Sequence, residues 1–223
     1  MTSRQGGFGI PREGSQAVID AIQRLGDSPL VRGLVVRIDS PGGAVAASQE
    51  LYEALRRFRK GGRPVVVSFG DVAASGGYYV ACAADKIVSN PGTTTGSIGV
   101  IMVAPDMKGL YDWVRIQWNV IKSGQFKDIL SPYRAMTAAE RIQLQNLVGD
   151  AYEQFFEVVH RGRQIPRERL LTLAQGQVFT GRQAQKLGLV DELGDYEHAL
   201  LLAGQLAKLP GRPREIRIRE KTG

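Results

Sequence analysis

The segment around Ser75 carries a residue type that can do nucleophilic chemistry. Ser75 lies in the small-residue stretch AASGG of residues 73–77, between a strand-like run and a helix-like run. At such a turn a serine is accessible, and the free N–H groups of the helix start can stabilise an anion that forms beside its hydroxyl. Ala73 departs from the G-x-S-x-G pattern of α/β-hydrolases, so that fold is not indicated. The alternative, that Ser75 only caps the helix, stays open on this segment alone.

A serine hydroxyl attacks a carbonyl carbon only when a neighbouring base takes its proton. The two histidines, His160 and His198, fall in helix-like segments away from the glycine turns, and we interpret them as surface or packing residues. Lysine is the remaining candidate, and the loop 122–128 contains Lys122 and Lys127. A lysine acts as a base near neutral pH only if burial lowers its pKa from about 10.4 to about 7–8. The alternative for each of these lysines is a solvated surface charge.

Two further turns of small residues can supply hydrogen-bonding groups. The sequence DSPGG of residues 39–43 follows a strand-like run, and its unobstructed N–H groups can form an oxyanion hole together with the Gly76 N–H. The sequence TTTGSIG of residues 93–99 carries hydroxyl groups that can orient an amine. Glycine turns are common, so neither turn identifies a site by itself.

The elements around these turns alternate between strand-like and helix-like patterns, which predicts an α/β fold with mainly parallel strands. Ser15 is expected to cap the first helix and Thr180 a late one, and Ile142 and Phe155 are expected on the apolar face of a long helix. We expect one domain of residues 15–208 between a flexible segment, 1–14, and a basic tail, 209–223. The expected strands are 33–38, 64–69, 87–89, 97–103, 116–121 and 177–179, and the expected helices are 15–26, one ending before Gly61, 75–84, 137–164, 180–188 and 196–208.

The composition is that of an ordinary soluble globular domain, with 223 residues of which 43% are hydrophobic and 23% charged. No run approaches the roughly 18–20 apolar residues that a membrane span needs, and the start lacks an apolar signal core. The single cysteine, Cys82, excludes an intrachain disulfide and a thiolate metal site, and we expect no metal and no cofactor. The net charge of +7 is scattered until the tail, so no nucleic-acid partner is expected.

Together these segments resemble the signal peptide peptidase A family, the S49 serine peptidases, in a short single-domain form. That family is related in fold to the Clp proteases and crotonases, so the resemblance implies a Clp protease/crotonase-like repeated ββα spiral with a mainly parallel sheet. It covers residues 15–202 in the right order. The matching segments are RIDSPGG at 37–43, AASGGYY at 73–79, TGSIGV at 95–100, KSGQFKD at 122–128, and TGRQA at 180–184 with LGLVD at 187–191.

The resemblance also implies a role for individual residues. The Clp proteases place a histidine soon after the nucleophile, whereas none occurs here between Ser75 and His160, which fits a Ser-Lys dyad. The lysine base of the family falls on Lys127 rather than on Lys122. The implied site residues are Ser75 as nucleophile, Lys127 as general base, Ser97 as the hydroxyl that orients the lysine amine, and the backbone of Gly42 and Gly76 as oxyanion donors.

The implied activity is that of a serine endopeptidase that degrades cleaved signal peptides and other unfolded peptides. The family resemblance implies a homo-oligomeric ring with active sites at subunit interfaces, and a membrane anchor with the peptidase domain outside the cytoplasm. Residues 1–14 supply no anchor, so the chain as written is expected to be soluble, with the anchor either removed or absent from this member. The alternative is a catalytically silent crotonase-like oligomeric scaffold or acyl-binding protein, which would need Gly42 and Gly76 but not Ser75 with Lys127.

Overall fold

The computed structural model of the chain describes residues 12–216, which form two compact units. Unit 1 combines the described residues up to Gly99 with those from Phe155 onward, and unit 2 is Val100–Gln154. The predicted end segments, 1–14 and 209–223, lie outside the described part except for residues 12–14 and 209–216. Residues 12–14 already belong to helix α1, Arg12–Asp27, which therefore begins earlier than predicted.

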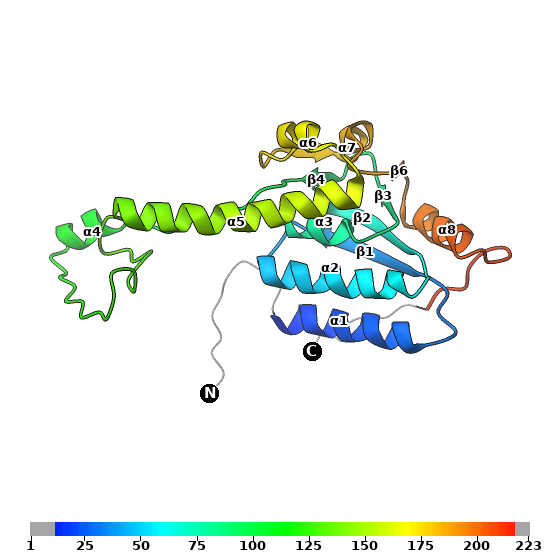
Figure 1. Cartoon of the computed structure of the whole chain (residues 1–223), viewed down its shortest axis with the longest axis horizontal. Helices are drawn as coiled ribbons and strands as arrows, with labels where there is room; N and C mark the ends of the chain where they lie inside the picture. The colour runs from blue at the N-terminus through cyan, green and yellow to red at the C-terminus, as the bar shows by residue number, and fades with distance from the viewer. Residues whose placement is uncertain (1–11, 217–223) are drawn as a thin grey trace. The chain divides into compact units, whose positions relative to one another are not determined.

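Unit 1 is built on a curled, mostly parallel sheet (Figure 1). Its strands follow the order β5-β4-β2-β3-β6, and β1 pairs with β2 beside this path. Every pair is parallel except β4 with β5. This confirms the predicted α/β fold of the Clp protease/crotonase-like type. The strands are β1, Leu34–Ser40; β2, Val65–Ala74; β3, Lys86–Ser89; β4, Thr94–Gly96; β5, Val178–Thr180; and β6, Glu192–Leu193.

Strand β2 is the centre of this sheet because it pairs with three neighbours. Its first half lies between β1 and β3, and its last three residues pair with β4. Val65, Val66 and Val67 are fully buried, as expected for a β-branched run covered on both faces. The strand continues through Ala74, five residues beyond its predicted end at 69, so the chain stays extended until it reaches Ser75.

Helices cover the sheet of unit 1. In Figure 1, α1 and α2, Val45–Lys60, run side by side, and α8, Tyr196–Leu206, packs on β1, β2 and β3. Thr180 begins α7, Gly181–Leu187, with a capping box to Gln183, which confirms the predicted cap. The short helices α3, Gly76–Ala81, and α6, Arg167–Leu173, complete the unit, and α6 was not predicted.

Ser15 does not cap the first helix, because it lies inside α1 and is almost fully buried. The long helix is α5, Ala138–Arg163, close to its predicted bounds. Its predicted apolar face is only partly correct: Phe155 is buried, whereas Ile142 is 63% exposed. Helical spacing locates a face, but only a packed neighbour buries it.

Unit 2 contains helix α4, Lys108–Trp113, which was not predicted, and the first part of α5, but no strand. The predicted strands 97–103 and 116–121 are therefore wrong. The apolar side chains that suggested them are exposed, with Ile101 at 87% and Val103 at 83%. A strand needs a neighbour to pair its backbone N–H and C=O groups, and alternation in sequence does not supply one.

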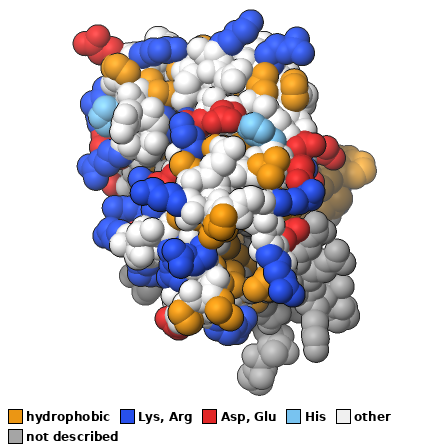
Figure 2. Space-filling model, turned by 90° about the vertical axis from the view of Figure 1, so that its right-hand side faces the viewer, with side chains coloured by type: hydrophobic (Ala, Val, Ile, Leu, Met, Phe, Trp, Pro, Cys, Tyr) orange, Lys and Arg blue, Asp and Glu red, His pale blue; other side chains and the backbone are white. Residues whose placement is uncertain are grey.

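Charge is dispersed over the face of the molecule that Figure 2 shows. On the face seen in Figure 2, Lys and Arg side chains alternate with acidic and uncharged ones. Ion pairs contribute to this mixing, for example Arg59 with Asp85 at 2.7 Å and Arg163 with Asp191 at 2.9 Å. Within residues 12–216, no helix is both long and apolar enough to cross a membrane.

Two glycines of α5 give a matched stability test. A Cβ on Gly162 would lie 2.5 Å from the carbonyl oxygen of Cys82, whereas a Cβ on Gly149 would meet nothing within 4 Å. Gly162→Ala is expected to lower the free energy of unfolding by about 1–3 kcal/mol because backbone must move. Gly149→Ala is expected to raise it by about 0.5–1 kcal/mol through helix propensity. Urea unfolding followed by circular dichroism measures both, and equal effects would contradict the close packing at Gly162.

Candidate active site

Ser75 occupies the turn between β2 and α3 in a conformation that L-residues rarely adopt. Its backbone angles are φ 51° and ψ −120°, which cost about 1–3 kcal/mol for a residue with a Cβ. Two hydrogen bonds hold the turn: the Ser75 N–H donates to Gly96 O at 2.9 Å, and its carbonyl accepts from the Tyr79 N–H at 2.9 Å. The half-buried hydroxyl makes no hydrogen bond within residues 12–216 and does not cap α3. Helix capping therefore does not explain Ser75.

The glycine turn 42–43 lies directly against Ser75. A Cβ on Gly42 would lie 2.8 Å from the Ser75 Cβ and 3.1 Å from the Gly76 nitrogen. A Cβ on Gly76 would in turn lie 3.1 Å from the Gly43 nitrogen and would overlap the Ser48 hydroxyl. A side chain at Gly42 would collide with Ser75, and one at Gly76 would displace the Ser48 hydroxyl, so the two glycine-containing turns pack closely against each other.

Ser40 and Asp39 hold the glycine turn at the end of β1. The Ser40 Oγ accepts the Gly42 N–H at 3.2 Å, while the Gly43 N–H has no acceptor in the described part of the chain. The Asp39 Oδ1 accepts the Val72 N–H at 3.0 Å, where the register of β1 and β2 shifts. Gly70 leaves room for this carboxylate, since a Cβ there would lie 2.6 Å from the Asp39 Cγ.

Ser97 lies next to the Ser75 turn. It directly follows Gly96, whose carbonyl accepts the Ser75 N–H, and it is half-buried. Its own N–H donates to Gln177 O at 2.8 Å, and its φ of 49° is again left-handed. Unit 1 thus brings together four of the five predicted site residues, namely Ser75, Gly76, Gly42 and Ser97.

Lys127, the fifth predicted site residue, belongs to unit 2. It lies in an exposed turn in which its N–H donates to Gly124 O at 3.2 Å. Its amine makes no hydrogen bond or ion pair within residues 12–216. Lys122 differs, because its amine bonds to Asp128 at 2.7 Å and to the carbonyl of Gln125 at 3.2 Å. Of the two lysines that the sequence offered, only Lys127 has an amine without a carboxylate partner in the described structure.

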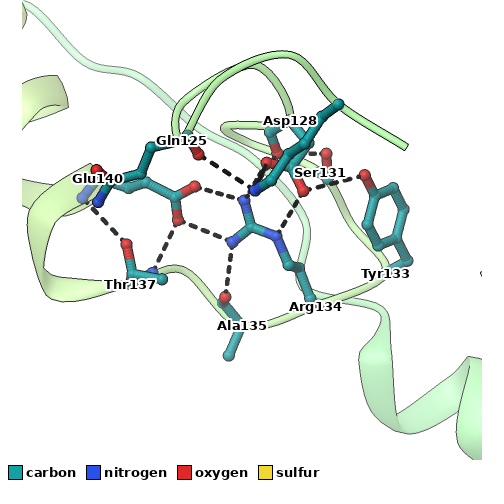
Figure 3. A network of polar contacts seen from close by, with 9 residues as sticks. Gln125, Asp128, Ser131, Tyr133, Arg134, Ala135, Thr137 and Glu140 are labelled. Atoms are coloured by element: carbon teal, nitrogen blue, oxygen red, sulfur yellow. Dashed lines mark hydrogen bonds and ion pairs between the residues drawn. The ribbon is translucent and has the colours of Figure 1, made fainter. Parts of the chain in front are cut away.

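An Arg134 network anchors the loop that carries Lys127 (Figure 3). The Arg134 guanidinium donates to both carboxylate oxygens of Asp128, at 2.9 and 2.7 Å, and to both of Glu140. Glu140 also forms a capping box with Thr137: it accepts the Thr137 N–H at 2.9 Å, and its own N–H donates to Thr137 Oγ1 at 3.2 Å. The loop is therefore tied to the first turn of α5.

The charges of this network shift the proton affinities of its members. Hydrogen bonds from Arg134, with a smaller contribution from Lys122, hold the pKa of Asp128 well below its ordinary value. Hydrogen bonds from Arg134 and from the Thr137 backbone lower the pKa of Glu140 from 4.5 to about 2. Both carboxylates therefore stay ionised at neutral pH, and Arg134 stays between two negative charges.

This network was not predicted from the sequence. The segment TAAE at 137–140 is a readable capping-box signal, but nothing in the spacing indicates that Arg134 joins Glu140 to Asp128. Ser40 was also missed, although it lies within the matched segment at 37–43. No group of three or more His, Cys, Asp or Glu side chains in residues 12–216 is arranged to hold a metal ion.

Comparison with known proteins identifies the class. The sequence matches the family model described as Peptidase family S49 over residues 57–210. The chain therefore belongs to peptidase family S49, a family of proteases, as its motifs predicted.

The relatives agree with this assignment. The chain is 44% identical to the candidate protease slr0021 of Synechocystis sp. over 87% of this chain and 69% of that protein. It is 35% identical to the candidate signal peptide peptidase SppA of Enterococcus faecium, over 83% of this chain and 54% of that protein. It is 32% identical to the chloroplastic serine protease SPPA of Arabidopsis thaliana, over 88% of this chain and 29% of that protein. The chain thus spans only about half the length of the Enterococcus relative and less of the Arabidopsis one.

The left-handed backbone of Ser75 predicts a difference in stability between two variants that both lack the hydroxyl. Ser75→Gly removes the Cβ that makes φ 51° costly, whereas Ser75→Ala keeps it, and both remove the hydroxyl. We expect the glycine variant to be more stable than the alanine variant by about 1 kcal/mol. Urea unfolding of both proteins measures the difference. An alanine variant equal to or more stable than the glycine variant would show that the turn is not strained.

Proposed function

We propose that this chain is a serine endopeptidase that uses a Ser75-Lys127 dyad to degrade cleaved signal peptides and other unfolded peptides. The observation that carries the proposal is the hydroxyl of Ser75, which has no hydrogen-bond partner among residues 12–216 and lies on a left-handed turn against the glycine backbone at 42–43. Strained backbone at a strand-to-helix turn is typical of nucleophiles, because it exposes the hydroxyl and leaves N–H groups beside it.

The first half of the proposed reaction forms an acyl-enzyme. The neutral amine of Lys127 takes the Ser75 proton while Oγ bonds to the peptide carbonyl carbon, and the carbonyl π electrons move to oxygen. The Gly76 and Gly42 N–H groups hold the resulting oxyanion. The Ser40 hydroxyl, which now accepts from Gly42, is a weaker acceptor than an oxyanion and gives way to it.

The second half releases the products. The C–N bond breaks as the Lys127 ammonium gives its proton to the leaving amine, which leaves an ester on Ser75. Water then gives a proton to the Lys127 amine as its oxygen attacks the ester carbonyl carbon. The Lys127 ammonium returns this proton to the Ser75 oxygen when the bond to the carboxylic acid product breaks. Ser97, beside the Ser75 turn, orients the lysine amine through its hydroxyl.

The contacts of the two lysines support Lys127 as the base. A carboxylate within hydrogen-bonding distance stabilises an ammonium and opposes loss of its proton. Lys122 has such a partner in Asp128, at 2.7 Å, and Lys127 has none in the described residues. An amine free of fixed negative charge is the one that burial in an assembled, water-poor site turns into a base.

We further propose that active sites form between copies in a homo-oligomeric ring. Unit 2 exposes more apolar side chains than its small size would lead one to expect, among them Trp113 at 80% and Ile121 at 102%. An exposed apolar surface of this kind is typical of a contact with another chain. By family resemblance the ring acts at a membrane, on the side away from the cytoplasm.

Labelling with a fluorophosphonate tests the dyad. Wild-type protein is expected to be modified at Ser75, and Ser75→Ala and Lys127→Ala are each expected to reduce labelling at least about 100-fold, as is usual when a nucleophile loses its base. Lys108→Ala, a change of a paired surface lysine in the same unit, serves as the control and is expected to label normally. Peptide mass mapping locates the modification. Normal labelling of Lys127→Ala with loss in Lys122→Ala would reassign the base.

Mixing inactive variants tests whether the site lies between copies. Ser75→Ala chains keep the lysine and Lys127→Ala chains keep the serine, so a mixed ring contains some intact pairs. Random assembly gives about a quarter of wild-type sites. Peptidase activity measured after co-refolding an equal mixture is expected to approach that fraction. A mixture as inactive as its components would place both residues of each site in one chain.

A further inference from the structure

The loop that carries Lys127 depends on a single cation outside it. Apart from turns, residues 122–131 form no regular secondary structure. Their links to α5 in the described structure run through Arg134, which bonds to Asp128 on one side and Glu140 on the other (Figure 3). We infer that Arg134 is a positioning residue that fixes the Lys127 loop and keeps Asp128 away from the lysine amine. This inference rests on the proposed role of Lys127 as base.

Arg134 is held at its far end by a buried carboxylate. Glu140 is 1% exposed, and both of its oxygens accept from the guanidinium while one also accepts the Thr137 N–H. A planar guanidinium that forks to a carboxylate on each side has one orientation, which a lysine in its place would not reproduce. The first turn of α5 thus holds the Arg134 side chain in place, and Arg134 in turn bonds to the loop.

On the side of the loop, Arg134 forms hydrogen bonds to Asp128, the residue that follows Lys127. Its Nε and Nη2 donate to the two carboxylate oxygens of Asp128, and Nη2 also reaches the Asp128 carbonyl at 3.2 Å. Side chain and backbone of the loop are therefore both held. Because Asp128 directly follows Lys127, any shift of Asp128 moves the Cα of Lys127 as well.

The same contacts occupy the acceptor sites of Asp128. Its Oδ1 accepts from Lys122 and Arg134, and its Oδ2 accepts from Arg134 and, at 3.4 Å, from the Tyr133 hydroxyl. A carboxylate offers about four such sites, so Asp128 has none left for its neighbour. Without Arg134, two of these sites open beside Lys127. An ion pair between Asp128 and the lysine would keep the amine protonated and unable to act as a base.

Kinetics of Arg134→Gln and Arg134→Lys test the inference, with Arg141→Gln as the matched control. Arg141 is an exposed arginine of α5 whose side chain has no partner in residues 12–216. Both Arg134 variants are expected to lower kcat roughly 10- to 100-fold with KM changed less than about twofold, because the base is misplaced rather than the peptide. The pH of half-maximal kcat is expected to move upward, and Arg141→Gln is expected to match wild type in all three.

A double variant and hydrogen exchange separate positioning from mere folding. Arg134→Gln with Asp128→Asn removes the competing carboxylate, so it is expected to restore the wild-type pH of half-maximal kcat while kcat stays low. The Lys127 amide, which donates to Gly124, is expected to exchange faster in both Arg134 variants, whereas amides of β2 keep wild-type protection. A wild-type pH profile together with unchanged exchange at Lys127 would overturn the inference. Full activity of Lys127→Ala would instead overturn the proposed function, whatever the Arg134 variants do.

Discussion

The left-handed backbone of Ser75 is the constraint on which the rest of unit 1 depends. No residue with a side chain adopts φ 51° and ψ −120° unless its surroundings enforce it. Here β2 delivers the chain to the turn fully extended, Gly96 accepts its N–H, and α3 begins at the next residue. The absence of side chains at Gly42 and Gly76 is then a steric requirement, since each approaches the other turn within van der Waals contact.

A second principle, the distribution of charge, organises unit 2. Arg134 neutralises two carboxylates, one of them almost fully buried, and Lys122 adds a second cation to Asp128. A buried carboxylate without such a partner would be costly, so the network is also what allows α5 to begin at Ala138 with Glu140 turned inward. Lys127 remains outside these pairs, which distinguishes it from the other lysine of its loop.

The sequence predicted those parts of the fold in which pattern and packing agree. The β-branched strand before residue 39, the helix cap at Thr180 and the extent of the long helix were all predicted from the sequence. The prediction of a strand at 116–121 was wrong because alternating apolar residues do not indicate whether a neighbouring strand is present to pair with. The prediction that Ile142 is buried was wrong for a related reason. Helical spacing predicted which residues share a face of α5, but among its apolar side chains only Phe155, Phe156 and Val159 are buried in a core.

The sequence indicated the chemistry that we propose for the site, but it did not indicate the backbone geometry or the polar network around it. Small residues around Ser75 indicated a turn open to a substrate, and the family resemblance chose among the lysines. The backbone angles of Ser75 and Ser97 could not be predicted, because serine ordinarily avoids positive φ and only the surrounding packing imposes it. Asp128 and Glu140 each lie six residues from Arg134, a spacing that does not put two residues on one face of a helix, and residues 128–137 form no helix or strand whose periodicity could predict their contact.

The phenol of Tyr78 bears on when the Ser75 turn becomes ordered during synthesis. Tyr78 lies in α3, three residues after Ser75, and its fully buried hydroxyl donates to Leu189 O at 2.7 Å. Until the ribosome has released Leu189, that hydroxyl has no acceptor, and burying it unpaired costs about 1–3 kcal/mol. A nascent chain therefore reaches its mature α3 only after Leu189, 111 residues beyond Tyr78, has emerged, which ties the ordering of the Ser75 turn to a much later segment of the chain.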